Sequence, residues 1–242
     1  MIQGIDIAAM RGLDWLKKQE PATIKDISRS IQALSLWNEP ASSLIGLLLS
    51  ERKGGFWETD TLLLDTARAC SALAGCGQVQ RDSIRWILNQ QKNDNWSNDG
   101  IDTAYALIAL GDCRVKNESG CKWLVRNYGE KYEHVGTTSL IITALFKQDK
   151  KKYRDFIKNR AGWILSKRES GGWTHIATSN LAIQALILAG VEYIEPSILW
   201  LLGKQETDNW GNITSTSLSL ISLRMYLDKL NSISHYEEAK ER

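Results

Sequence analysis

The sequence is poor in residues that interrupt helices and in residues that cross-link small proteins. It has three prolines and four cysteines in 242 residues, and the cysteines form neither a CxxC pair nor a zinc-finger spacing. No apolar run approaches the ~20 residues of a membrane span. The N-terminus lacks a basic segment followed by an apolar core, so we expect no signal peptide. These absences predict a cytoplasmic protein with reduced thiols and no membrane span.

The sequence also has little excess of one sign of charge over the other. The net charge is +2, and no basic stripe alternates with aromatic residues, which argues against a nucleic-acid partner. Phenylalanine is rare, with three residues, whereas there are ten tryptophans. An excess of this kind indicates that tryptophan fills a repeated structural position.

Six short apolar segments, each beginning with Asp, Ser or Thr, recur along the chain. Their closing leucines stand 35 to 41 residues apart, at Leu34, Leu73, Leu110, Leu145, Leu186 and Leu223. The opening residues are good helix N-caps, and the segments have almost no polar face. We therefore expect six buried inner helices, at 26–34, 65–73, 102–110, 137–145, 178–186 and 215–223.

The segments between them are amphipathic and charged, which predicts an outer layer of helices. They cover 12–19, 43–53, 82–92, 118–127, 155–168 and 197–205. The sequence thus predicts an all-α fold, a single (α/α)6 toroid of six helical hairpins over residues 1–232. Residues 233–242 are expected to form a charged C-terminal tail.

Tryptophans recur at a spacing of ten residues, as in Trp86 and Trp96, or Trp200 and Trp210. Gln91 lies midway in the first pair. We expect the second tryptophan to pack at the end of the outer helix, with the glutamine bridging free backbone groups there.

These W-[LI]-x3-Q-x4-W units resemble the QW repeats of squalene–hopene and oxidosqualene cyclases, which are related in fold to protein prenyltransferase β subunits. The resemblance spans roughly residues 4–230, although Asn95 and Asn209 replace the usual glycine before the tryptophan. It implies an (α/α)6 toroid and isoprenoid chemistry. The chain is too short for the two-domain build of those cyclases.

Aspartates occupy one register at the start of the first three inner segments, at Asp26, Asp65 and Asp102, and Asp99 lies one turn earlier than Asp102. Their ordinary role would be helix capping or favourable interaction with the helix dipole. The resemblance implies a second role, because protonation-initiated cyclases carry a D-x-D-D-T-A signature there, whose middle aspartate is the acid. In this chain that middle position is Ile101. Asp102 is therefore the best candidate for a general acid or metal ligand, with Asp99 and Asp65 assisting.

Two metal-dependent alternatives follow from the same resemblance. Ionisation-initiated chemistry would need carboxylates holding Mg²⁺ on a diphosphate. The usual DDxxD run is absent, but Asp99, Asp102, Asp65 and Glu58 or Asp60 are candidate ligands, so Mg²⁺ is a candidate cofactor. The zinc site of prenyltransferases lacks its D-x-C pair and its histidine, so we predict no zinc site. His134 and His175 share a register in neighbouring hairpins. They are candidates for substrate binding, or simply loop histidines.

Arg29, Arg68 and Tyr105 each follow one of the aspartates by three residues and so share its helix face. If this face points to the toroid axis, one wall of the cavity is polar. The opposite wall would carry Leu140, Leu181 and Leu218. Such a cavity suits an amphiphile such as a prenyl diphosphate, although the arginines would alternatively neutralise their aspartates.

The leading hypothesis is an isoprenoid-handling enzyme, a terpene cyclase or prenyltransferase-like protein. Its substrate would lie in the axial cavity beneath the inner-helix starts, bound by Arg68, Tyr105, Arg29 and Asp26. One alternative is a non-catalytic toroid that binds a peptide or protein. Another is a carbohydrate-active toroid with Glu58 or Asp60 opposite Asp102. The basic stretch 147–160 would allow peripheral contact with anionic lipid, or is a solvated helix face.

Overall fold

The computed structural model describes the backbone of residues 1–240 and the side chains of residues 1–232. Over residues 1–240 it contains twelve α-helices, one short 3₁₀ helix and one two-stranded hairpin, which confirms the all-α class. Helix α12 extends through Lys240, so the backbone of residues 233–240 in the predicted tail is helical. The side chains of residues 233–242 lie outside the described residues. Within residues 1–240, no helix has the length and apolar content needed to span a bilayer.

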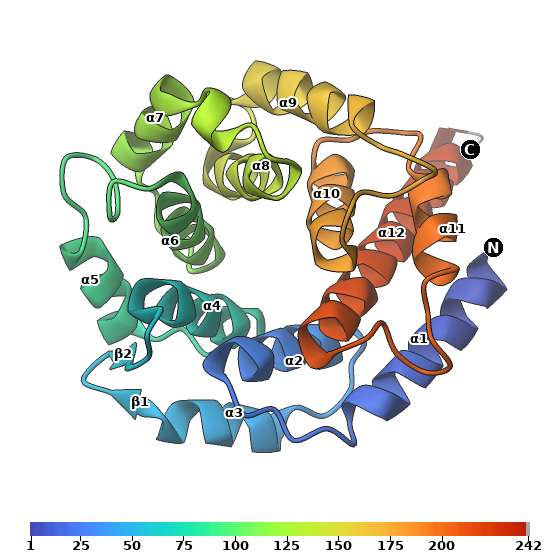
Figure 1. The fold of residues 1–242 in the computed structure, drawn as a ribbon, viewed down its shortest axis with the longest axis horizontal. Helices are drawn as coiled ribbons and strands as arrows, with labels where there is room; N and C mark the ends of the chain where they lie inside the picture. Colours follow the sequence, from blue (N-terminus) through green and yellow to red (C-terminus); the bar gives the residue numbers. More distant parts are fainter. Residues whose placement is uncertain (241–242) are drawn as a thin grey trace.

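Six helices lie around the centre of the molecule (Figure 1). They are α2 (Ile24–Leu36), α4 (Leu62–Gly75), α6 (Gly100–Asp112), α8 (Val135–Asp149), α10 (Ile176–Leu188) and α12 (Ile213–Lys240). Each packs against the next in chain order, and α12 packs against α2, so the contacts close into a ring. All six predicted apolar segments fall inside these helices.

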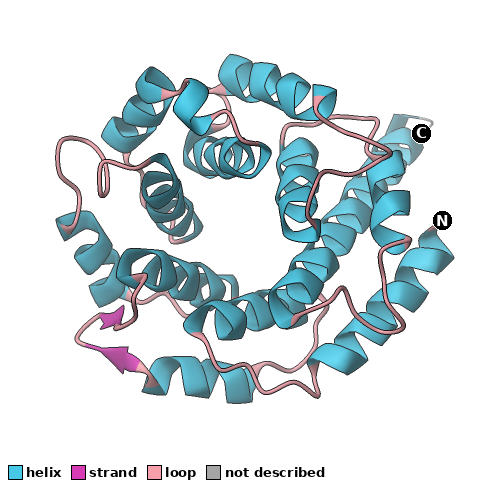
Figure 2. Ribbon diagram, viewed as in Figure 1, coloured by secondary structure: helices cyan, strands magenta, loops and turns pink. Residues whose placement is uncertain are grey.

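The remaining helices lie outside this ring (Figure 2). They are α1 (Ile2–Leu16), α3 (Ser42–Ser50), α5 (Arg81–Asn89), α7 (Glu118–Asn127), α9 (Arg154–Ser166) and α11 (Glu195–Leu202). The hairpin β1 (Arg52–Lys53) and β2 (Phe56–Trp57) follows α3, and η1 (Glu130–Tyr132) precedes α8. Helix α1 begins ten residues earlier than the segment predicted at 12–19. Ile5, Ala8 and Ala9 are also buried, so the packed face of the helix extends toward the N-terminus.

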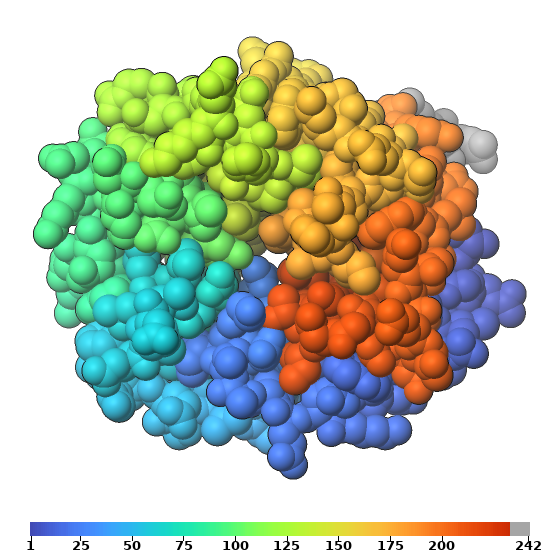
Figure 3. All heavy atoms as spheres, viewed as in Figure 1, coloured from blue at the N-terminus to red at the C-terminus, as the bar shows by residue number. Residues whose placement is uncertain are grey.

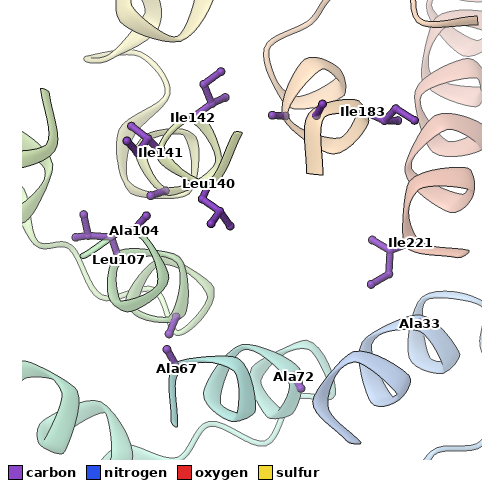
Figure 4. Close-up of a cluster of buried hydrophobic side chains, with 14 of the residues drawn as sticks. Ala33, Ala67, Ala72, Ala104, Leu107, Leu140, Ile141, Ile142, Ile183 and Ile221 are labelled. Carbon is purple, nitrogen blue, oxygen red and sulfur yellow. The ribbon is translucent and has the colours of Figure 1, made fainter. Parts of the chain in front are cut away.

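Small and branched apolar side chains fill the contacts between the inner helices. Figure 4 shows Ala67 and Ala104 at the helix contacts, while Leu140 and Ile221 point toward the middle of the ring. Alanine leaves room for two helix backbones to approach closely at such contacts. The larger residues remain available to line the centre.

The repeated tryptophans join four of the outer helices to the inner helix that follows each of them. Four of them donate their indole N–H to a backbone carbonyl nine residues earlier, near the end of the outer helix: Trp57 to Leu48, Trp96 to Ile87, Trp173 to Ile164 and Trp210 to Leu201. Their backbone N–H groups donate to hydroxyls of the next inner helix, on Thr66, Thr103, Ser179 and Thr216. The expected packing at the helix end is therefore present, with a second hydrogen bond that the spacing did not predict.

The glutamines of these units reach the neighbouring outer helix. Gln205 donates to the carbonyl of Ala8 in α1 at 2.9 Å. Gln91 exchanges hydrogen bonds with the side chain of Asn117, which caps α7. Only Gln205 thus meets a backbone group, and both side chains connect adjacent hairpins rather than closing one helix end.

The first and last hairpins are joined by side chains from both inner helices. Thr214 donates to the carboxylate of Asp26 at 2.5 Å, and the Trp37 indole donates to the carbonyl of Leu220 at 3.0 Å. Asp26 also accepts a hydrogen bond from Thr23, the N-cap of α2. Asp26 therefore serves the closure of the ring in the first instance.

Replacing Thr103 by valine tests the tryptophan connection. The change removes the hydroxyl that accepts from the backbone N–H of Trp96 and keeps the shape of the fully buried side chain. An unpaired buried N–H costs about 1–3 kcal/mol, so the free energy of unfolding should fall by that amount in urea denaturation. The control is Thr143→Val, whose hydroxyl bonds only to Ser139 in its own helix. Equal effects of the two changes would contradict the assignment.

Candidate functional site

The ring encloses an axial cavity of about 330 Å³, to which all six inner helices contribute. Its lining begins near the middle of these helices and continues to their C-terminal ends, at Leu36, Gly75, Asp112 and Leu188. The space-filling view shows side chains narrowing the middle of the ring to a small hollow (Figure 3). The volume lies within the range of small-molecule sites. The cavity was expected beneath the starts of the inner helices, but it lies nearer their C-terminal ends.

Arg68 is the centre of the polar wall. Its Nη1 donates to the carboxylate of Asp65 at 2.8 Å, and its guanidinium lies over the ring of Tyr105 at 4.6 Å. Its Nε is buried and has no hydrogen-bond partner among the described residues. Burial would lower the pKa of Arg68, but the nearby hydroxyl of Tyr105 and the carboxylate of Asp65 raise it, so the cation is retained in the cavity.

Asp65 is fully occupied by its neighbours. Besides the ion pair with Arg68, its carboxylate accepts hydrogen bonds from the hydroxyls of Thr59 and Thr61, at 2.9 and 2.8 Å. Only 9% of its side chain is exposed. These contacts position Arg68 and leave Asp65 outside the cavity lining.

Tyr105 stands between two cations. Its hydroxyl accepts a hydrogen bond from Arg29 at 3.4 Å, while Arg68 covers its ring. Burial raises the pKa of Tyr105, but the positive charges of Arg29 and Arg68 outweigh burial, so the pKa lies below the usual value of a phenol. Arg29 otherwise donates to Gln32 and makes no ion pair with a described carboxylate. The polar wall therefore has a positive charge that the protein leaves uncompensated.

The opposite wall is mainly apolar. It consists of Leu140, Leu181, Leu188, Ile221 and Met225. Leu218, which was expected here, is buried without lining the cavity, because α12 turns its Ile221 face to the axis.

The amide of Gln184 on this side is bound to the carbonyl of Leu218 and the hydroxyl of Ser222. It therefore supports the contact between α10 and α12. At the rim, Asp112 and Lys147 form an ion pair. Both lie two turns beyond an expected lining position, Tyr105 and Leu140, and this i+7 spacing would have identified them from the sequence.

The predicted catalytic carboxylates lie apart from the axial cavity. Asp99 caps α6 and accepts from the backbone N–H groups of Ile101 and Asp102, at 2.7 and 3.1 Å. Asp102 lines a separate groove of about 500 Å³ together with Asp60 and Trp86. Its carboxylate has no hydrogen bond with another described residue. The three carboxylates Asp65, Asp99 and Asp102 thus have three different surroundings.

The two predicted histidines line a third site, separate from the axial cavity and from the Asp102 groove. His134 and His175 are the N-caps of α8 and α10, and both line one groove of about 640 Å³ at the helix starts. Both side chains are exposed. They therefore share a site, as their register suggested, but this site is not the axial cavity.

The carboxylates do not converge on a position suited to Mg²⁺. Asp65 is bound to Arg68, Asp99 is engaged in capping, and Asp102 faces another groove. Among the described residues, no group of three or more His, Cys, Asp and Glu side chains is arranged to hold a metal ion. The described residues therefore do not fit the magnesium-dependent alternative.

The shifted pKa of Tyr105 can be measured by absorbance titration of tyrosine ionisation. The wild type should show one transition below the usual range of phenols, and Tyr105→Phe should remove it. Arg29→Met should move the transition to higher pH, because it removes a charge that favours the phenolate. Tyr193→Phe, at an exposed position, is the control and should leave the transition unchanged. Persistence of the early transition in Tyr105→Phe would show that another residue causes it.

The chain matches none of the models of known protein families, and a search of curated proteins gives no match either. The geometry of the axial cavity and of the two grooves is therefore the basis for a functional assignment.

Proposed function

We propose that the chain is an (α/α)6 toroid that handles an isoprenoid, with a prenyl diphosphate bound in the axial cavity. The closed contacts of the six inner helices and the outer position of the other six support the toroid. The observation that carries the ligand class is the two-sided lining of the cavity, with Arg29, Arg68 and Tyr105 facing an apolar wall.

The polar wall fits the diphosphate head. Arg29 lacks a carboxylate partner, and the Nε of Arg68 has no acceptor among the described residues. Guanidinium groups bind phosphate oxygens through charge-assisted hydrogen bonds, which are stronger than neutral ones. An anionic head between the two arginines would accept hydrogen bonds from Arg29 and balance the positive charge that remains beside the Asp65–Arg68 ion pair.

The apolar wall fits the hydrocarbon tail. Leu140, Leu181 and Ile221 come from three consecutive inner helices and offer branched surfaces without free polar groups. Transfer of a prenyl chain from water to this surface is favourable by about 25 cal/mol per Å² of apolar area removed from water. The head and tail thus have separate binding surfaces in one cavity.

Chemistry on this ligand would require a proton donor or acceptor in the cavity. Tyr105 is an ionisable hydroxyl beside the proposed head site, whereas Asp112 is paired with Lys147. Asp102 would act on an isoprenoid only if the substrate reached the groove at the helix starts. Binding without turnover would favour the non-catalytic alternative, in which the toroid presents a ligand or a protein partner.

One observation favours a second candidate, a carbohydrate-active site. Asp60 and Asp102 line the same groove as Trp86, Gln90 and Ser97. Paired carboxylates perform glycoside hydrolysis, and an aromatic ring provides a surface for a sugar. Glu58, the other carboxylate considered, instead pairs with Lys53 and is exposed.

The arginines allow a direct test of the isoprenoid proposal by calorimetry with geranyl diphosphate. Arg29→Met and Arg68→Met should each weaken binding about 10- to 100-fold, since a hydrogen bond to a charged group contributes about 1.5–3 kcal/mol. Arg85→Met, at an exposed position on α5, should have no effect. Geraniol and inorganic diphosphate, which each lack one half of the ligand, should bind more weakly than the whole. Unchanged affinity in both arginine variants would reject the head site.

Asp102→Asn tests whether catalysis takes place in the groove that Asp102 lines. The substitution keeps the shape of the side chain and removes its acid, so turnover of a substrate bound in this groove, an oligosaccharide or a prenyl diphosphate that reaches it, should be abolished while the circular dichroism spectrum is unchanged. Asp208→Asn, at an exposed position in the α11–α12 connection, is the matched control. Full activity in Asp102→Asn would exclude Asp102 as the acid.

A further inference from the structure

A groove at the helix starts, which we call the histidine groove, is separate from the axial cavity. It lies where α8 and α10 begin side by side and encloses about 640 Å³. Its polar lining consists of His134, Thr137, Thr174, His175, Thr178 and Lys167, with Glu133. Trp163 and Trp173 provide its aromatic surface. The axial cavity shares none of these residues.

Two helix N-termini open into this groove without side-chain caps. His134 and His175 occupy the N-cap positions, but neither side chain hydrogen-bonds to its helix. The first backbone bonds run from Thr138 to the carbonyl of His134 and from Ser179 to that of His175. The preceding amides, at 135–137 and 176–178, have no acceptor among the described residues. Free amides and the helix dipole favour an anion at such an end.

The side chain of Thr137 gives an independent indication of a ligand. Thr137 is 9% exposed, lines the groove, and has no hydrogen bond with another described residue through its hydroxyl. The adjacent hydroxyls are satisfied: Thr138 contacts Tyr128 at 2.9 Å, and Ser139 donates to Val135. Because the side chain lines the groove, its hydroxyl is available to donate to a ligand bound there.

The charged side chains of the groove and the space beside Gly136 also fit an anionic ligand. The carboxylate of Glu133 is held by Arg160 at 3.0 Å, and Lys167 brings a cation over the ring of Trp163. A Cβ added at Gly136 would meet only the Thr178 side chain, at 3.9 Å, so the backbone of α8 is open to a ligand there. The groove thus offers amides, hydroxyls, imidazoles and an ammonium group around an open space.

We propose that the histidine groove binds a phosphate group. A tetrahedral oxyanion accepts hydrogen bonds in several directions at once, which matches two converging helix starts and the hydroxyls of Thr137 and Thr178. The phosphate belongs either to the free ion or to an ester whose organic part lies on Trp163. This site does not depend on the isoprenoid proposal, because it uses other residues at the other end of the inner helices.

Histidine ring signals provide the readout, since the chain has three histidines. In ¹H–¹³C spectra of the full chain at constant pH, inorganic phosphate should shift the signals of His134 and His175 together with one saturable dissociation constant. His134→Asn and His175→Asn assign the two signals. Tighter binding of phenyl phosphate would identify an ester as the natural class, and equal binding would identify the free ion.

Thr137→Val is the decisive variant, because it removes only the unpartnered hydroxyl. It should weaken phosphate binding about tenfold, and Gly136→Val, which fills the open space, should weaken it further. Thr143→Val, in the same helix but on the axial cavity, should bind phosphate as the wild type does. The proposal is overturned if no saturable shift occurs, if sodium chloride produces the same shifts, or if folded Thr137→Val and Gly136→Val both bind phosphate normally.

Discussion

Each tryptophan-linked hairpin depends on a buried tryptophan whose two N–H groups donate in different directions. The indole N–H of Trp96 satisfies a carbonyl at the end of one helix, and its backbone N–H meets a hydroxyl in the next. A turn between two helices normally leaves such groups to water. Here a single residue satisfies both ends, so the outer helix is fixed against the inner one. Four of the inner helices, α4, α6, α10 and α12, are attached to the preceding outer helix in this way.

The polarity of the axial cavity depends on which face of each inner helix points toward the axis of the ring. The hairpins built on α2, α4 and α6 bring Arg29, Arg68 and Tyr105 to the axis, and those that follow bring Leu140 and Leu181. Asp65 lies behind this surface and holds Arg68 in place. Asp26, Asp65 and Asp99 at the helix starts therefore act mainly on structure, whereas the residues one turn after Asp26, Asp65 and Asp102 meet the cavity.

The helical periods and the tryptophan spacing were sufficient to predict the all-α class and the helix pairs, because local patterns encode both. They were also sufficient to place Arg68 and Tyr105 on one face. They left open whether Asp102 would serve the axial cavity or lie with Asp60, as in the carbohydrate-active alternative, since that depends on how α6 packs against α4. The three-residue offset in α12, which replaces Leu218 by Ile221 in the lining, has the same origin. Such rotations are set by packing between hairpins, and no single segment contains that information.

The contacts between Asp26 and Thr214, and between Gln205 and Ala8, have a consequence for synthesis of the chain. Open repeat proteins need only nearest neighbours along the sequence, so they can grow stepwise from one end. In this chain the first hairpin finds its second neighbour only after α11 and α12 have been synthesised. Its apolar surface must wait for α11 and α12, and this long-range closure slows folding and favours an all-or-none final step. The same closure gives the first and last described hairpins a neighbour on both sides.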